Sequence, residues 1–320
     1  MTFHFDAEQP QSRFVFWTPP EGRTVELGPE QRPVTLGSDP LPLHRVDAEE
    51  GEPDNNAIGQ GLYDFLRQFP DAEEGRYYAE LLRDAFPHFL AELAAQTLML
   101  EHKEVDAPYI RRKIVGLKIF ALLEPKNPGL LQQLGTVCYQ LAMMFSELRE
   151  SRRHLLAAMN YLQRGLQLAA EDPHSLNLLG QIAYWLGDYP SAARHWRGTV
   201  ALLADGAAKM AILAKITVLE NEEAPDHPLV DDLEQIGDAM LLLGNGDSET
   251  ACLILERLEE ENIIPQEMPT AQFYHLLGRC RELTGDAGGA FAAYDQALEL
   301  DPDYLPAQEG KERIVEGEGS

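Results

Sequence analysis

The chain has 320 residues, of which 53 are acidic and 26 are basic, so its formal net charge is −27. A hydrophobic fraction of 44% is enough for a buried core, and a charged fraction of 25% is ordinary for a folded protein, which excludes global disorder. The strong negative charge argues against a general nucleic-acid binder and against a protein held on anionic lipid.

Residues 1–55 are β-prone and rich in proline. Short runs of strand-forming residues, 13–17, 24–27 and 33–36, are separated by Pro and Gly turn signals. Because proline cannot donate to a β-ladder, we expect a small meander or an extended arm rather than a central sheet. Residues 47–55 have the composition of an acidic linker.

Residues 56–127 form an N-terminal helical segment by their pattern. Apolar residues at helical spacing predict a helix over 58–69 and a longer one over 71–103, which Pro87 is expected to kink or split. A further helix is predicted over 110–123. This last helix looks like the second helix of a two-helix repeat that has degenerated, with no recognisable first helix before it.

A repeated motif occupies residues 128–305. Small residues at two positions would let paired helices approach closely, a Gly-Asp pair would turn the chain, and a proline would stop the second helix. The best copy contains Tyr274, Leu277, Gly278, Gly285, Asp286, Ala290, Tyr294, Ala297 and Pro302.

The motif recurs upstream in three further copies. They are marked by Leu134-Gly135 with Ala158, Leu162 and Gly165, by Leu179-Gly180 with Gly187-Asp188, Ala192 and Trp196, and by Ile236-Gly237 with Gly246-Asp247, Ala251, Leu255 and Leu258. The first of these has 23 residues from its glycine to its alanine, against 12 in the last copy, so we expect two longer helices joined near residues 146–151. An additional helix is expected near residues 207–219.

These spacings and residue types resemble the tetratricopeptide repeat (TPR), a 34-residue pair of antiparallel helices. The last copy matches seven of the eight signature positions, and Arg281 stands where an aromatic residue is usual. The resemblance covers residues 128–305 and, in degenerate form, 56–127. It implies an all-α fold, a TPR-type α-solenoid of antiparallel helix pairs with four repeats and a small β-prone N-terminal arm. We expect on the order of 60–70% helix and an acidic C-terminal tail over residues 306–320.

Charge is distributed unevenly along the chain. Residues 1–102 carry a net charge of −12, residues 103–215 carry +5, and residues 216–320 carry −20 with 25 acidic and 5 basic side chains. Such asymmetry can steer an approaching partner.

No motif for catalysis or cofactor binding is found in the sequence. Phosphate loops, dinucleotide fingerprints, nucleophile elbows and paired-histidine metal motifs are absent, and none of the nine histidines has another ligand-type residue at a convincing spacing. We therefore expect no catalytic residues, no metal and no cofactor, and a protein that is not an enzyme.

The resemblance implies that the first helices of the repeats line a concave groove that binds a segment of another protein. The expected partner has an apolar anchor for the aromatic residues and basic residues for the acidic ones. The groove positions are Gln132, Thr136, Tyr139, Asn177, Gln181, Tyr184 and its neighbour Trp185, Glu234, Asp238, His275, Arg279 and Glu282.

The leading hypothesis for function is a scaffold or adaptor for protein–protein interaction. One alternative is a chaperone for a secreted or assembling subunit, which the acidic surface would suit. Another is a nucleic-acid-linked regulator that uses the basic middle segment, through Arg111, Arg112, Lys113, Arg149, Arg152 and Arg153. These bases lack the interleaved aromatic residues of a stacking platform, so nucleic-acid binding is disfavoured.

Cysteine usage and the N-terminal residues predict a cytoplasmic location. The three cysteines, Cys138, Cys252 and Cys280, are odd in number and far apart, which fits neither a disulfide framework nor a zinc site. The first six residues lack the basic and apolar regions of a signal peptide, and no run of about 18 apolar residues predicts a membrane span.

Overall fold

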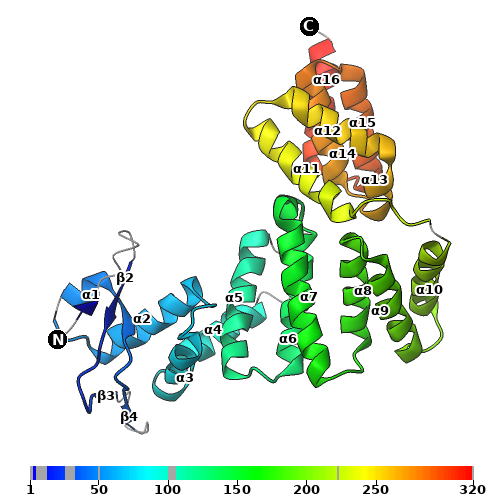
Figure 1. Cartoon of the computed structure of the whole chain (residues 1–320). Helices are drawn as coiled ribbons and strands as arrows, with labels where there is room; N and C mark the ends of the chain where they lie inside the picture. Colours follow the sequence, from blue (N-terminus) through cyan, green and yellow to red (C-terminus); the bar gives the residue numbers. More distant parts are fainter. Residues whose placement is uncertain are drawn as a thin grey trace. The chain divides into compact units, whose positions relative to one another are not determined.

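The computed structural model describes residues 3–4, 13–25, 33–49, 51–99, 106–221 and 223–318 (Figure 1). Helices make up 74% of the structure, slightly more than expected. Within the described residues there are sixteen α-helices and five short strands, and every strand precedes Arg45. The prediction of a mainly helical fold with β structure only near the N-terminus is confirmed. The chain divides into two compact units, Met1–Val137 and Cys138–Ser320.

The strands of the first unit form a small antiparallel sheet and a separate hairpin. The sheet has the order β1 (Phe3–His4), β2 (Phe14–Trp17), β5 (Leu41–His44), and the hairpin joins β3 (Thr24–Val25) to β4 (Val34–Thr35). In the β2–β5 ladder Phe14 lies opposite His44 and Trp17 lies opposite Leu41. Phe14 and Trp17 stand on opposite faces of β2, yet Phe14, Trp17 and Leu41 are each at most 3% exposed, so both faces of this part of the sheet are covered.

The sheet packs directly on helix α2 (Asn55–Gln68) and shares one hydrophobic cluster with it and with the helices that follow. The closest approach is at Gly61, where a Cβ atom would lie 2.3 Å from the carbonyl oxygen of Pro42 in β5. Only glycine allows the two backbones to meet this closely. The described part of the expected arm is therefore built into the core of the first unit rather than extended away from it.

The expected acidic linker, residues 47–55, is largely taken up by structure. Helix α1 (Arg45–Glu49) follows β5 without a break. The Asp54 side chain caps α2 by accepting a hydrogen bond of 2.7 Å from the amide of Ala57, and Nη2 of Arg23 donates to the carbonyl oxygen of Pro53 over 3.3 Å. Acidic residues near a helix N-terminus stabilise it, which is why this composition does not mark a free linker here.

The remaining helices of the first unit follow the predicted pattern. Pro87 splits the long predicted helix as expected, because proline lacks an amide hydrogen and is tolerated only in the first turn. The helices are α3 (Gly75–Ala85), α4 (Pro87–Met99), α5 (Ala107–Leu123) and α6 (Pro128–Ala142), the last of which continues into the second unit.

In the described residues of the second unit, helices are the only regular secondary structure. None of the helices in the described part of the chain is long and apolar enough to cross a bilayer. The elements of the second unit are a 3₁₀ helix η2 (Phe145–Glu150), α7 (Ser151–Leu168), α8 (Pro173–Trp185), α9 (Tyr189–Leu202), α10 (Ala207–Glu220), α11 (Leu229–Gly244), α12 (Ser248–Glu261), α13 (Ile263–Glu267), α14 (Ala271–Thr284), α15 (Ala287–Leu300) and α16 (Leu305–Glu318).

The additional length of the first repeat copy is used differently from the prediction. We expected two helices extended past their neighbours, but α6 ends at Ala142 and the extra residues form η2. The hydroxyl of Ser151, at the start of α7, donates a 2.7 Å hydrogen bond to the carbonyl oxygen of Ala142. This bond takes up a helix-terminal carbonyl and draws the start of α7 back onto the end of α6, leaving Leu148 of η2 fully buried.

The stacking of helix pairs is interrupted after α9. Helix α10 packs on α9, in the place that the next repeat would occupy, and α11 packs instead on η2 and α7. The contact is backbone to backbone: a Cβ atom on Gly237 of α11 would lie 2.4 Å from the amide nitrogen of Arg149. By analogy with the other copies, Gly237 was expected to contact the second helix of its own pair. In the structure it contacts the backbone of η2.

Candidate functional site

Three helix pairs of the second unit, α8–α9, α11–α12 and α14–α15, are joined by the same two-residue turn. A glycine in the left-handed region ends the first helix, at Gly187 (φ +78°), Gly246 (φ +88°) and Gly285 (φ +88°). The aspartate after it caps the second helix by accepting a backbone hydrogen bond. These bonds are Ser191 N to Asp188 Oδ1 (3.1 Å), Thr250 N to Asp247 Oδ1 (3.2 Å) and Gly289 N to Asp286 Oδ1 (2.9 Å).

Two of these pairs close on a glycine set against an aromatic ring. A Cβ atom on Gly180 would lie 2.3 Å from the indole of Trp196, and one on Gly278 would lie 2.7 Å from the ring of Tyr294. The alanine of the second helix, such as Ala290, is fully buried. These are tetratricopeptide-type helix pairs. The all-α, TPR-type fold is therefore confirmed by the chain's own turn and contact geometry.

The structure shows why Arg281 can stand where the repeat signature has an aromatic residue. Its guanidinium reaches from α14 to α12, with Nε 3.2 Å from Glu256 and Nη2 2.5 Å from Glu259. The side chain is only 15% exposed. An aromatic residue at this position would fill the same space by apolar contact, whereas here two ion pairs join neighbouring repeats.

The predicted groove residues of α6 and α8 differ in how they are engaged. Thr136 bonds back to its own helix, with Oγ1 donating to the carbonyl oxygen of Gln132 over 2.9 Å. Tyr139 lies beside the indole of Trp185, and burial raises its pKa. Tyr184 and Trp185 are 7% and 6% exposed, so their rings are part of the core and not a surface that a partner could use as an apolar anchor.

Tyr184 is held by helices that sequence analysis did not place beside it. Its hydroxyl donates a 2.8 Å hydrogen bond to Glu267 of α13, and the ammonium group of Lys215 in α10 lies 5.6 Å from the centre of its ring. Burial, followed by the bond to Glu267, raises the pKa of Tyr184. The ring therefore connects α8 to the short helix α13 and to the additional helix α10.

Asn177 and Gln181 stand one turn apart on α8, and both side chains are half-buried. Within the described residues neither amide side chain has a hydrogen-bond partner. An amide both donates and accepts, so this pair can bind another polar backbone.

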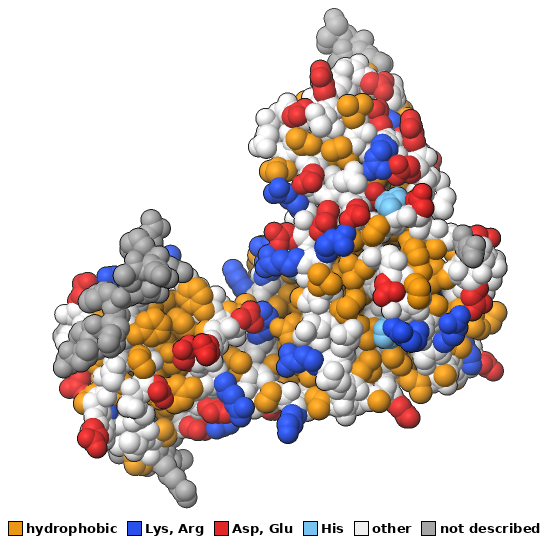
Figure 2. Space-filling model, viewed as in Figure 1, with side chains coloured by type: hydrophobic (Ala, Val, Ile, Leu, Met, Phe, Trp, Pro, Cys, Tyr) orange, Lys and Arg blue, Asp and Glu red, His pale blue; other side chains and the backbone are white. Residues whose placement is uncertain are grey.

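The acidic residues of α11 are already paired with the basic residues of the 3₁₀ helix and α7. Nε of Arg149 lies 2.9 Å from Asp238. The backbone amide of Arg152 donates to Glu234 over 3.1 Å, and its guanidinium also contacts Asp231. Figure 2 accordingly shows acidic and basic side chains interspersed over α7 to α16 rather than gathered into separate fields. The 80 or so residues that separate these partners in sequence hide the pairing from any local pattern.

The predicted groove residues of α14 face α16. Glu282 accepts hydrogen bonds from the hydroxyl of Tyr294 (2.6 Å) and from Nε and Nη2 of Arg313 (3.0 and 3.1 Å), with Arg279 at 3.2 Å. The bond from Arg313 is the main reason that the pKa of Glu282 is lowered to about 2. Burial, with Arg313 and Arg279 nearby, lowers the pKa of His275.

The segment expected as an acidic tail is therefore a packed helix over most of its length. A Cβ atom on Gly310 of α16 would lie 2.6 Å from the ring of Tyr294, and Ala307 is fully buried. Figure 1 shows α16 alongside α14 and α15. Sequence analysis missed this helix because its acidic composition hid the small residues that make the contact.

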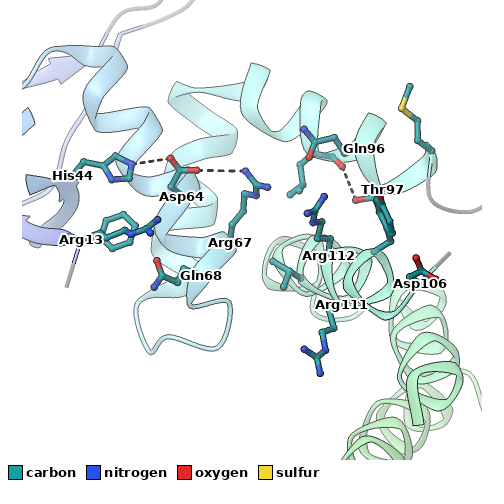
Figure 3. Close-up of a pocket in the computed structure, with 15 residues that line it drawn as sticks. Arg13, His44, Asp64, Arg67, Gln68, Gln96, Thr97, Asp106, Arg111 and Arg112 are labelled. Carbon is teal, nitrogen blue, oxygen red and sulfur yellow. Dashed lines mark hydrogen bonds and ion pairs between the residues drawn. The ribbon is translucent and has the colours of Figure 1, made fainter. Parts of the chain in front are cut away.

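Sequence analysis also missed a cavity of about 930 Å³ in the first unit (Figure 3). We call it the arginine cavity, because four arginines line it: Arg13, Arg67, Arg111 and Arg112. The lining comes from the β2–β5 edge of the sheet and from α2, α4 and α5, which lie far apart in sequence. Its other polar residues are His44, Asp64, Gln68, Gln96, Thr97 and Asp106, and its apolar ones are Phe14, Leu93, Met99, Tyr109 and Val115.

One carboxylate in the arginine cavity serves several donors. Asp64 lies 3.0 Å from Nε2 of His44, 2.7 Å from Nε2 of Gln60 and 3.8 Å from Nη1 of Arg67. On the opposite wall the guanidinium of Arg112 lies over the ring of Tyr109 at 5.4 Å. Figure 3 shows the Arg67 and Arg112 side chains approaching the same space from these two walls.

A cluster in the second unit brings together His227, Asp232 and Glu261, whose ligand-type atoms lie within 4.8 Å of one another. It was not visible in sequence because its members come from a linker, the start of α11 and the end of α12. Arg257 lies among them, 2.6 Å from Glu261 and 3.6 Å from the buried Asp232. The guanidinium thus supplies the positive charge that a metal ion would bring, and the cluster is organised as an ion-pair network.

Comparison with known proteins identifies only solved structures. No protein-family model and no curated protein matches the chain. A TPR protein from Thermus thermophilus, TTC0263, is 17% identical over 59% of this chain and 99% of its own, with a TM-score of 0.29. YrrB, described as a TPR protein with an unusual peptide-binding site, is 13% identical over 61% of this chain and 97% of its own, with a TM-score of 0.26.

The TPR domain of P58(IPK) is 14% identical over 82% of this chain and 69% of its own, with a TM-score of 0.33. The assignment of TPR-type helix pairs rests on the turns and contacts of the chain itself.

Proposed function

We propose that this chain is a non-enzymatic scaffold or adaptor that holds a segment of a partner protein against the partly exposed side of α8 that carries Asn177 and Gln181. The observation that carries the proposal is the pair of amides at Asn177 and Gln181, which are one helical turn apart and make no hydrogen bond to the described residues. Two such amides can donate to and accept from the backbone of an extended peptide at successive residues.

The acidic residues among the predicted groove positions contribute to this function mainly through long-range electrostatic attraction. Glu234, Asp238 and Glu282 are neutralised locally by arginines of the same unit. Residues 216–320 nevertheless carry a net charge of −20, which favours the approach of a partner with basic residues near its binding segment. The rings of Tyr184 and Trp185, at the end of α8, are buried in the core, so the proposal does not use them as the apolar anchor site.

Three of the six basic residues on which a nucleic-acid role depended are engaged by carboxylates. Arg149 pairs with Asp238, Arg152 with Glu234, and Arg153 with Glu150. No observation favours the chaperone alternative over the scaffold. The scaffold is therefore the one function that we put forward.

The test compares two matched double variants of the full chain as bait. Asn177→Ala with Gln181→Ala removes the amide pair on α8, and Gln163→Ala with Gln167→Ala removes an exposed pair one turn apart on α7. Pull-down with quantitative mass spectrometry should lose the specific partner by about tenfold with the α8 variant only, since each lost hydrogen bond costs about 0.5–1.5 kcal/mol. A photo-crosslinking residue at position 177 should capture that partner, and one at position 163 should not. Equal capture by both variants would exclude this site.

A further inference from the structure

We infer that the arginine cavity of the first unit binds an acidic, amphipathic segment of a partner protein, with carboxylates on its arginines and an apolar side chain at its rim. This site lies wholly within residues 1–137. It is independent of the proposed site on α8, and its ligand has the opposite charge.

The first argument is local charge. Four arginines line the cavity against two aspartates, in a chain whose net charge is −27. One of these aspartates, Asp64, is already shared by His44, Gln60 and Arg67. The described lining residues therefore carry an excess of positive charge, and charge complementarity selects an acidic ligand.

The second argument is the donor chemistry. A guanidinium presents a planar fork of N–H donors that matches a carboxylate. Arg67 is 41% exposed, and its nearest carboxylate oxygen lies at 3.8 Å, beyond hydrogen-bond distance. The guanidinium of Arg112 lies over the face of Tyr109, at 5.4 Å, so its N–H edge stays available to a ligand. Arg13 makes no side-chain ion pair within the described part of the chain.

The third argument is the apolar rim. Met99 and Tyr109 both line the cavity and are 72% and 45% exposed, while Phe14 and Leu93 close its floor and are buried. These two exposed apolar side chains form a rim that an apolar side chain of a ligand can cover when its carboxylates meet the arginines. A free inorganic anion would cover neither rim residue, and about 930 Å³ far exceeds its size. A peptide with both carboxylates and apolar side chains satisfies both parts of the lining.

The test uses a defined probe and the full-length chain. The probe is a fluorescein-labelled twelve-residue peptide of glutamate with leucine at every third and fourth position, and its binding is followed by fluorescence anisotropy. Arg67→Gln with Arg112→Gln should weaken binding by at least about tenfold, because each guanidinium makes a charge-assisted contact. A probe with glutamine in place of glutamate should bind as weakly to the unaltered chain.

The matched control removes two arginines of the same unit outside the cavity. Arg76 and Arg83 lie on α3 and are 65% and 51% exposed, each paired with an acidic neighbour. Arg76→Gln with Arg83→Gln changes the net charge by the same amount and should alter binding by less than about twofold. Equal weakening by the two double variants would show attraction to the whole surface and overturn the site.

A second cycle tests the apolar rim at Met99 alone, so that the ring of Tyr109, over which Arg112 lies, stays in place. Met99→Ala should weaken the leucine-containing probe by about threefold and leave a probe with alanine in place of leucine nearly unaffected. Full displacement of the probe by inorganic phosphate or by a single-stranded oligonucleotide at equal affinity would overturn the assignment to an acidic protein segment. The proposal would also be overturned if the probe did not bind the unaltered full-length chain while circular dichroism showed that this chain is folded and helical.

Discussion

Glu282 is expected to hold α16 on α14 through its negative charge. Its carboxylate accepts hydrogen bonds from Arg313 of α16 at 3.0 and 3.1 Å and from Tyr294 of α15 at 2.6 Å, and its side chain is 18% exposed. These donors, Arg313 foremost, lower the pKa of Glu282 from 4.5 to about 2. A group whose pKa falls on folding stabilises the folded state in its charged form.

The pKa shift sets the size of the effect. Between 4.5 and about 2 the pKa of Glu282 falls by roughly 2.5 units, and at about 1.36 kcal/mol per unit the charged form contributes about 3 kcal/mol. This contribution is present in full above pH 4.5. It is lost progressively as the pH falls from 4.5 to 2, where the carboxyl becomes protonated in both the folded and the unfolded chain.

Urea unfolding followed by circular dichroism measures this contribution in the Glu282→Gln variant. At pH 7 the variant should be less stable than the unaltered chain by about 3 kcal/mol, and the difference should shrink by about 1.4 kcal/mol for each pH unit below 4.5. The control is Glu312→Gln on the exposed side of α16, which should cost less than about 0.5 kcal/mol. A difference that is the same at pH 3 as at pH 7 would refute the reasoning, because it would not depend on the charge.

Three further predictions follow from the packing of the second unit. Gly278→Ala should cost about 1–3 kcal/mol of unfolding free energy, because its Cβ would lie 2.7 Å from an aromatic ring, whereas Gly288→Ala, with nothing closer than 3.9 Å, should gain about 0.5–1 kcal/mol from helix propensity; equal effects would contradict the close contact. Arg281→Met should cost about 1–3 kcal/mol in the same urea assay, since it leaves two carboxylates of α12 unpaired, and an unchanged midpoint would show that the ion pairs are not needed. Hydrogen bonds to Asp226 and Asp232 raise the pKa of His227, so the stabilisation by its imidazolium is complete below pH 6.5 and lost as the pH rises through the raised pKa. An NMR titration should place His227 above 6.5, and Asp232→Asn should bring it down; a value at or below 6.5 in the unaltered chain would contradict the network.

Local patterns predicted the elements of this fold well. Pro87 divides two helices because its missing amide hydrogen is tolerated only at a helix start. The Gly-Asp turns, such as Gly285-Asp286, appear where expected because a positive φ and a side-chain cap are properties of those two residues alone. Within the described part of the β-prone N-terminal segment there are short strands, which fits the predicted small meander better than the extended arm, and the pattern did not show that this sheet joins the core.

The candidate binding residues were predicted less well, because their environment comes from distant parts of the chain. Repeat register correctly placed Glu234, Asp238 and Glu282 on first helices, but it could not show that Arg149, Arg152 and Arg313 neutralise them. Of the four arginines in the arginine cavity, sequence analysis singled out only Arg111 and Arg112, as part of a basic segment, and it gave no sign that a cavity forms there. A guanidinium's partner depends on which helix is packed beside it, and that is set by the whole core.

The sequence by itself determined the helix pairs of this protein, since their turns, caps and small contact residues act over a few positions each. It also determined the large excess of acidic charge and the confinement of strands to the N-terminal segment. Only the tertiary structure decided which surfaces remain open to a partner. Gly237 shows why: the same small residue that closes a helix pair elsewhere lies against the backbone of Arg149 here, because packing depends on the neighbour that arrives and not on the motif that carries the residue.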